Sequence, residues 1–166
     1  MPGQHNTTTP EAEADLWRTP PEVFALAKSF ISPGEFVIDV AATQSNSLCE
    51  SYIDERTDGL KVEWSLLGWA FCNPPYSRGN LPRWTLKSVH EALAGRQSVL
   101  LLPFTGEEWF CEHVVGRAQI VVLRPRVAFL RPDGSVGGSP RTASCLAIYR
   151  AGAKYDGPLT VERWRA

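Results

Sequence analysis

The sequence predicts a single α/β domain built on a mostly parallel sheet with a late antiparallel hairpin. The first observation is a set of short apolar runs of strand length, at residues 36–42, 67–72, 97–103, 118–123 and 143–149. The second is that amphipathic segments with helical spacing, at 81–94 and 106–115, separate several of these runs. The third is a turn-rich stretch at 127–140, which suits a hairpin arm or a mobile loop before the last run.

Length and composition fit one domain with short flanking segments. The chain has 166 residues, of which 43% are hydrophobic and 21% charged, enough for a sizeable core. We expect a flexible arm at residues 1–15, a domain at 16–150 and a peripheral tail at 151–166. No apolar run approaches about 18 residues, and residues 1–9 are polar without a signal-peptide core, so we expect a cytoplasmic protein and no membrane partner.

The net charge of −1 hides an uneven distribution. Residues 1–72 hold 4 Lys or Arg and 11 Asp or Glu, whereas residues 73–166 hold 13 and 7. A basic second half suits a nucleic-acid face and equally suits an ordinary surface, so charge alone leaves both open. The 4 cysteines have no CxxC pair and, with 3 His, make a poor zinc set, so we expect reduced thiols and no metal.

The first helix is expected at residues 22–30, where apolar residues recur at helical spacing. Thr19 stands where an N-cap would lie, and Pro20 or Pro21 suits the first turn, because an N–H there would have no partner within the helix. Pro33 and the glycine that follows it end the helix.

The run at 36–42 carries one acid, Asp39, near its end. A buried carboxylate is costly unless hydrogen-bonded, and the carboxyl ends of strands in open α/β sheets bind ligands, so Asp39 is a candidate site residue. The alternative is that Asp39 caps the next turn. We expect a brief helix at 46–52, followed by a turn at 58–60 in which Asp58, by its chemistry alone, is a turn former.

The most specific motif is the stretch Phe71-Cys72-Asn73-Pro74-Pro75-Tyr76-Ser77. Its prolines fix φ at about −65° and remove two backbone donors, which leaves carbonyls free to accept from a ligand. Asn73 Oδ1 and the Pro74 carbonyl offer two acceptors, and Tyr76 offers a flat aromatic face. This set suits a planar ring with an exocyclic NH2, although a strand-ending turn with a surface tyrosine would use the same residues.

The second half of the chain supplies the remaining elements. The helix at 81–94 is expected to direct Arg83, Lys87 and Glu91 outward at i, i+4 spacing. Thr105, after the strand at 97–103, is a candidate cap for the helix at 106–115.

The order of these motifs resembles the phage-type (Dam-like) DNA adenine-N6 methyltransferases. The residues that carry the resemblance are Trp17, Thr19-Pro20, Asp39-Val40-Ala41-Ala42, Asn46, Cys49, Tyr52, Asp58-Gly59-Leu60, Trp64, 71–77, Leu101-Leu102-Pro103 and Trp109-Phe110. The resemblance implies a Rossmann-like class I S-adenosylmethionine-dependent methyltransferase fold with an antiparallel last strand. It also implies S-adenosylmethionine as cofactor, DNA as partner and, for a phage-encoded protein, the cytoplasm of a bacterial host.

The resemblance also implies roles for single residues. The catalytic turn would comprise Asn73, Pro74, Pro75 and Tyr76. The cofactor site would include Thr19, Pro20, Asp39, Ala41 and Asp58. The first strand lacks the Phe-x-Gly-x-Gly of most methyltransferases, and the acid that would hold the cofactor ribose stays open among Glu50, Asp54 and Glu55.

The implied chemistry is methyl transfer to adenine N6, whose lone pair is delocalised into the ring. Acceptors at Asn73 and Pro74 would take its two N–H bonds, while Tyr76 stacks on the flipped base. Candidate nucleic-acid contacts are Ser77, Arg78, Arg83, Arg124, Arg126, Arg131 and Arg141. The same motif fits methyltransferases that act on RNA or on a protein glutamine amide, and a catalytically inactive nucleic-acid-binding member of the fold is a further alternative.

Overall fold

The computed structural model describes residues 15–165, so the arm expected at 1–15 lies outside the described residues except for Asp15. Its elements, in chain order, are α2 (Pro21–Ile31), β1 (Phe36–Asp39), β2 (Ser51–Tyr52), β3 (Trp69–Cys72), α3 (Asn80–Leu93), β4 (Ser98–Pro103), α4 (Glu108–His113), β5 (Gln119–Arg124), β6 (Ser144–Tyr149) and β7 (Thr160–Arg163).

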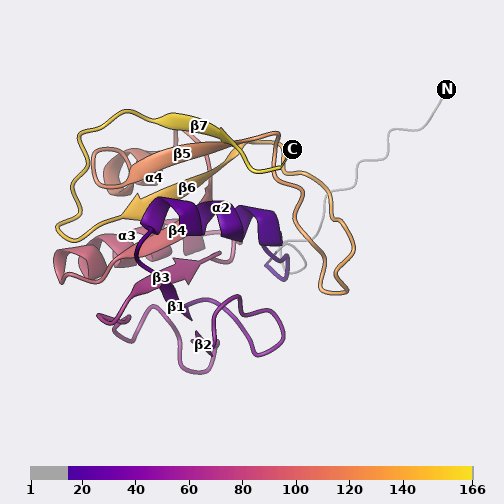
Figure 1. The fold of residues 1–166 in the computed structure, drawn as a ribbon, viewed down its shortest axis with the longest axis horizontal. Coiled ribbons are helices and arrows are strands. Elements are labelled where there is room, and N and C mark those ends of the chain that lie inside the picture. The colour runs from indigo at the N-terminus through magenta and orange to yellow at the C-terminus, as the bar shows by residue number, and fades with distance from the viewer. Residues whose placement is uncertain (1–14, 166) are drawn as a thin grey trace.

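The seven strands form one sheet in the order β2-β1-β3-β4-β6-β5-β7 (Figure 1). Every pairing is parallel except those of β6, which runs antiparallel to both β4 and β5. The predicted α/β class with a mostly parallel sheet is confirmed, and so is the antiparallel strand near residues 143–149. A further strand, β7, follows β6 and pairs with β5 in parallel.

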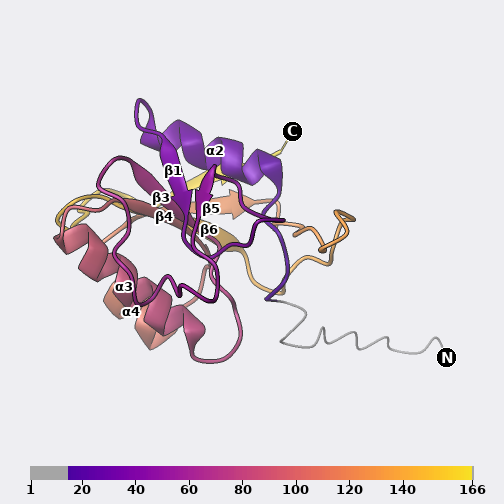
Figure 2. The same ribbon diagram turned by 90° about the horizontal axis from the view of Figure 1, so that it is seen from below.

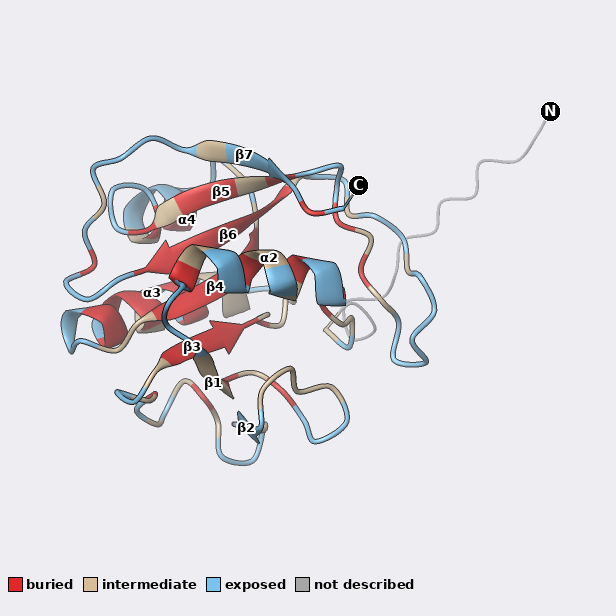
Figure 3. Ribbon diagram, in the orientation of Figure 1, coloured by how far each residue is buried: buried red, intermediate tan, exposed pale blue. Residues whose placement is uncertain are grey.

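Helices cover both faces of the sheet. Figure 2 shows α2 on one face and α3 with α4 on the other. Along β4, Leu100 and Leu102 pack into the core that includes residues of α3 and α4, whereas Val99 and Leu101 pack with α2. This alternation follows from the pleat of the strand, and it explains why β3, β4 and β6 are buried along nearly their whole length (Figure 3).

The segment expected as a peripheral tail supplies the strand at one edge of the sheet. Trp164, directly after β7, is buried in the core on the α2 face. Its indole Nε1 donates to the Pro125 carbonyl at 2.7 Å, and its main-chain N–H donates to the Arg124 carbonyl. Residues beyond 150 therefore contribute to the core of the domain.

The helix predicted at 46–52 is wrong. Residues 43–47 form turns, and Ser51–Tyr52 form β2. The side-chain oxygen of Asn46 accepts the Thr43 N–H at 2.7 Å, and Ser47 Oγ accepts the Cys49 N–H at 3.2 Å. Short polar side chains that bond the local backbone in this way compete with helix formation.

Details of three helices also differ from the expectations. The N-cap of α2 is Pro20 and not Thr19, and that of α4 is Glu107 and not Thr105, whose Oγ1 accepts the Glu107 N–H. On α3, the outward orientation expected for Glu91 is wrong, because this residue is only 4% exposed. Its carboxylate accepts the Trp64 N–H, which fastens the preceding loop to the helix.

Candidate active site

The Asn-Pro-Pro-Tyr turn leaves the sheet directly after β3. This strand lies between β1 and β4, and all four of its residues are buried. Because the three strands are parallel, the turn emerges at the edge where β1 and β4 also end. Within residues 15–165 the Pro74 carbonyl accepts no main-chain hydrogen bond, so it is free to accept from a ligand.

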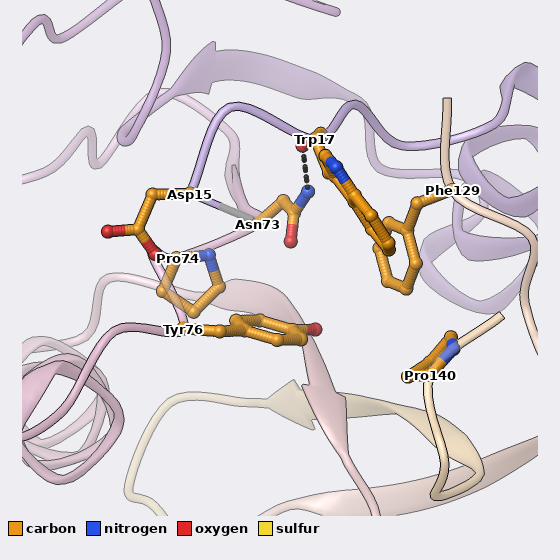
Figure 4. A pocket seen from close by; sticks show the side chains of 7 residues that line it. All are labelled: Asp15, Trp17, Asn73, Pro74, Tyr76, Phe129 and Pro140. Atoms are coloured by element: carbon orange, nitrogen blue, oxygen red, sulfur yellow. Dashed lines mark hydrogen bonds between the residues drawn. The ribbon is translucent and has the colours of Figure 1, made fainter. Parts of the chain in front are cut away.

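The amide of Asn73 has a defined orientation. Its Nδ2 donates to the Trp17 carbonyl at 3.3 Å, although the two residues are 56 positions apart. With the nitrogen held there, the side-chain oxygen points away from Trp17 and toward the ring of Tyr76 (Figure 4). An acceptor without a proton therefore faces the space above the tyrosine.

Tyr76 is held as a fixed platform. Its hydroxyl donates to the Leu101 carbonyl at 2.8 Å, and its ring meets Phe129 edge to face with centroids 6.1 Å apart. Burial raises the pKa of the Tyr76 hydroxyl well above its usual value, so this group stays neutral and remains a donor to Leu101. Anchoring at both ends of the side chain fixes the plane on which a flat ring can stack.

A pocket of about 120 Å³ opens beside the turn. Its walls are formed by Asp15, Trp17, Asn73, Pro74, Tyr76, Phe129 and Pro140 (Figure 4). The lining is mostly aromatic and proline side chains, with the Asn73 amide and the Asp15 carboxylate as polar groups. Such a lining fits a planar, mostly apolar ring that carries a few hydrogen-bonding groups.

Sequence reasoning missed four of these wall residues as site residues: Asp15, Trp17, Phe129 and Pro140. Trp17 was among the residues that carry the family resemblance, and this could have indicated that it lies near the Asn73 turn. Phe129 and Pro140 carried no such signal, since they lie more than 50 residues after the turn in a stretch that the sequence marks only as turn-rich.

Asp39, a predicted cofactor residue, is buried at the end of β1 beside the turn. Its cross-strand partner is Phe71, two residues before Asn73. Its oxygens accept the N–H groups of Ala41 at 3.4 Å and Leu48 at 3.2 Å. Burial raises the pKa of the carboxyl to about 6, against the lowering effect of these two bonds. Asp39 thus shapes the loop after β1, which leaves the sheet beside the strand that carries the Asn73 turn.

The other predicted cofactor residues do not line the pocket beside Asn73. Thr19 is buried and Pro20 precedes α2. Asp58 has a φ of 61° and forms a turn, where its carboxylate accepts the Leu60 N–H and pairs with Lys61 at 3.0 Å. The bond with Lys61 is the main cause of the lowered pKa of Asp58.

The candidate nucleic-acid residues differ in what their polar groups contact. Ser77 and Arg78 directly follow Tyr76; the Ser77 N–H donates to Asp15 Oδ1 at 2.8 Å, and Arg78 is exposed. Arg126 donates to the carbonyls of Pro140 and Arg141, and Arg131 donates to the Val136 carbonyl.

Arg126 and Arg131 therefore organise the loops next to the pocket. The other four candidate arginines are exposed: Arg78, Arg83, Arg124 and Arg141. Among residues 15–165, no group of three or more His, Cys, Asp or Glu is placed to hold a metal ion. In the same part of the chain, no helix combines the length and apolarity needed to cross a membrane.

The sheet order and the proline-rich turn at the end of a central strand define a protein of the Rossmann-like methyltransferase class. A family model described as DNA N-6-adenine-methyltransferase (Dam) matches residues 6–154. The chain belongs to this DNA N-6-adenine-methyltransferase family, as the motif order predicted.

One curated relative is described as a DNA N-6-adenine-methyltransferase of Escherichia phage T1. The two sequences are 34% identical over 116 residues, which cover 69% of this chain and 47% of the phage T1 protein. The chain thus spans about half the length of the curated relative that it matches.

Proposed function

We propose that this protein transfers a methyl group from S-adenosylmethionine to the exocyclic N6 of adenine in DNA. The observation that carries the proposal is the orientation of Asn73, whose Nδ2 bonds the Trp17 carbonyl and whose Oδ1 faces the pocket over Tyr76. An acceptor above an aromatic platform is what an adenine amino group requires, since N6 presents two donors and the ring stacks. Family membership supports the same chemistry.

The described residues fit a cationic cofactor next to this pocket. Asp39 provides a buried carboxylate at the end of β1, the strand next to the one that carries the turn, and it bonds the loop that follows β1. When bound, S-adenosylmethionine would supply the electrophilic methyl group. Thr19, Pro20, Asp39, Ala41 and Asp58 remain the residues proposed to hold it.

The chain's own residues would then orient the base and raise the nucleophilicity of N6. Asn73 Oδ1 and the Pro74 carbonyl accept one N–H each, which draws the nitrogen toward tetrahedral geometry and frees its lone pair. The fixed ring of Tyr76 stacks on the base, and Trp17 and Phe129 exclude water from the opposite side. A base in a duplex must leave the stack to reach this pocket.

A substrate panel tests the proposal. The purified protein is incubated with methyl-labelled S-adenosylmethionine and with double-stranded DNA, single-stranded DNA, RNA or a glutamine-containing protein. We expect label only in DNA, recovered as N6-methyladenine after digestion. Label in RNA or in the protein substrate would reassign the site to the alternatives that use the same turn. Cofactor binding without transfer, or no binding, would identify an inactive member of the fold.

A further inference from the structure

The hairpin at residues 127–137 lies against the segment that orients Asn73. The Arg18 N–H donates to the Leu130 carbonyl at 2.7 Å, and the Leu130 N–H donates to the Arg18 carbonyl at 3.0 Å. This two-bond bridge fixes the residue next to Trp17, whose carbonyl receives Asn73 Nδ2. The position of that carbonyl therefore depends on a part of the chain far from it in sequence.

Phe129 joins this hairpin to both sides of the pocket. Its side chain is 3% exposed, and its ring lies 6.2 Å from Trp17 and 6.1 Å from Tyr76, measured between ring centroids. It is thus in contact with the orienting segment and with the stacking platform (Figure 4). Tyr76 is anchored independently at Leu101, so the loss of Phe129 would act mainly on the Trp17 side.

The hairpin closes tightly behind Phe129. Leu130 bridges to Val136, and the Gly137 N–H donates to the Phe129 carbonyl at 2.6 Å. A Cβ at position 137 would lie 2.7 Å from that carbonyl oxygen, so only glycine permits this approach. Arg131 adds a bond to the Val136 carbonyl, which holds the two sides of the hairpin together.

The two ends of an amide side chain have nearly the same shape and opposite hydrogen-bonding character. If Asn73 turned by half a rotation, its NH2 would face the NH2 of adenine, and neither group could accept. The Trp17 carbonyl prevents this, because only the nitrogen end can bond to it. A hairpin that holds Trp17 in place therefore holds the catalytic acceptor in place.

We propose that Phe129 is a positioning residue that, through the hairpin at 127–137 and the Trp17–Arg18 segment, keeps the Asn73 side-chain oxygen facing the base. This inference rests on the proposed function for its effect on catalysis. Its structural part concerns the Asn73–Trp17 bond and can be measured without turnover.

The first readout is the side-chain amide signal of Asn73 in ¹⁵N NMR, assigned by its disappearance in Asn73→Asp. In Phe129→Ala we expect this signal to lose the shift and the slowed exchange that the bond to Trp17 confers. Phe129→Leu, which keeps an apolar side chain of similar bulk, should restore most of both. Val136→Ala, an exposed side chain on the same hairpin, should match the parent protein.

The second readout is turnover. Phe129→Ala should lower kcat for methyl transfer by about tenfold, the worth of one oriented hydrogen bond, with cofactor affinity within about twofold of the parent. In the Asn73→Asp background both side-chain oxygens accept, so orientation no longer matters. In that background, the factor by which Phe129→Ala lowers kcat should be at least about threefold smaller.

Several results would overturn the inference. These are an Asn73 signal unchanged by Phe129→Ala, or an equal loss of kcat in both Asn73 backgrounds. If Phe129→Ala does not fold, Gly137→Ala carries the same test, because it forces the hairpin apart while leaving Phe129 intact. A parent protein that methylates no DNA, yet loses the Asn73 signal on Phe129→Ala, would refute the proposed function and leave the positioning role supported.

Discussion

The Asp39 carboxylate accepts the main-chain N–H of Leu48 at 3.2 Å, nine residues further along the chain. Its other oxygen accepts the N–H of Ala41, so one side chain fastens both ends of the loop that follows β1. Because Asp39 is opposite Phe71 in the sheet, this loop is held next to the Asn73 turn. A single buried acid thus links the proposed cofactor side of the site to the catalytic side.

The first prediction concerns cofactor binding. Asp39→Ala removes the carboxylate and releases the loop at 41–48, so the affinity for S-adenosylmethionine should fall by at least about tenfold in titration calorimetry. Asp156→Ala is the matched control, because this exposed acid pairs with the equally exposed Lys154. Equal affinities for the Asp39 variant and the parent would remove Asp39 from the cofactor site.

The second prediction concerns pH. Burial raises the pKa of Asp39 from 3.8 to about 6, so the folded state holds this proton more tightly than the unfolded state does. The contribution of Asp39 to the free energy of unfolding is therefore greatest below about pH 4 and is lost as the pH rises through about 6.

The shift corresponds to roughly 3 kcal/mol. Urea unfolding is measured for the parent and for Asp39→Asn, whose side chain does not titrate. Between pH 4 and pH 7 the free energy of unfolding of the parent should fall by about this amount relative to that of the variant. A difference in unfolding free energy that stays constant with pH, or that changes in favour of the parent as the pH rises, would contradict the raised pKa of Asp39.

The third prediction concerns Asn73. Asn73→Ala should fold and bind the cofactor as the parent does, because its side chain makes one long hydrogen bond at the pocket wall. Methyl transfer should lose roughly 2–4 kcal/mol of transition-state stabilisation, or about 30- to 1,000-fold in kcat. Thermal melting establishes folding first. A folded variant with full activity would show that Asn73 is only a turn residue.

The fourth prediction concerns DNA affinity. Arg78 and Arg141 are exposed and follow two pocket residues in the chain, Tyr76 by two positions and Pro140 by one. Each phosphate contact contributes about one unit to the slope of log affinity against log salt, so Arg78→Ala or Arg141→Ala should reduce the slope by about one. Lys154→Ala, an exposed cation beyond β6, is the control.

The structure refines this prediction for the two arginines that organise loops. Arg126→Ala and Arg131→Ala should also reduce the salt slope if these cations touch phosphate. Arg131→Ala should in addition weaken the hairpin, since its guanidinium bonds the Val136 carbonyl, and Arg126→Ala should loosen the loop at 140–141, whose carbonyls it bonds. A salt-independent binding curve for the parent would favour a protein substrate instead.

The fifth prediction concerns stability. Glu91 is nearly buried, bonds the Trp64 N–H at 3.0 Å and pairs with Lys87 at 2.6 Å. Glu91→Ala leaves the buried Trp64 N–H and the mostly buried Lys87 ammonium without this partner, so the free energy of unfolding should fall by about 3–5 kcal/mol. Glu63→Ala removes an exposed partner of Arg96 and should cost less than about 1 kcal/mol in the same urea titration.

Local chemistry was enough to predict several parts of this protein. The runs that become β1, β3 and β4 are apolar at nearly every position, because a strand covered by helices on both faces has no solvent side. The turn after β3 was equally visible, since two adjacent prolines exclude helix and sheet and leave carbonyls without partners. Both features are set by residues that are neighbours in the chain.

The tertiary structure decided which partner each side chain meets. Sequence chemistry identified Asn73 as an acceptor, but the direction of its amide depends on the Trp17 carbonyl, which folding brings to it from 56 residues away. The aromatic wall opposite Tyr76 depends in the same way on Phe129, held by a bridge between Leu130 and Arg18.

The same reason explains the wrong expectation for Glu91. Helical spacing placed Glu91 on a polar face, yet the loop at 58–67 crosses that face and buries it. An element predicted from its own residues cannot reveal which other segment will pack on it. The sequence therefore determined the central strands and the chemistry of the turn, and the packing of distant segments determined how that turn is oriented and enclosed.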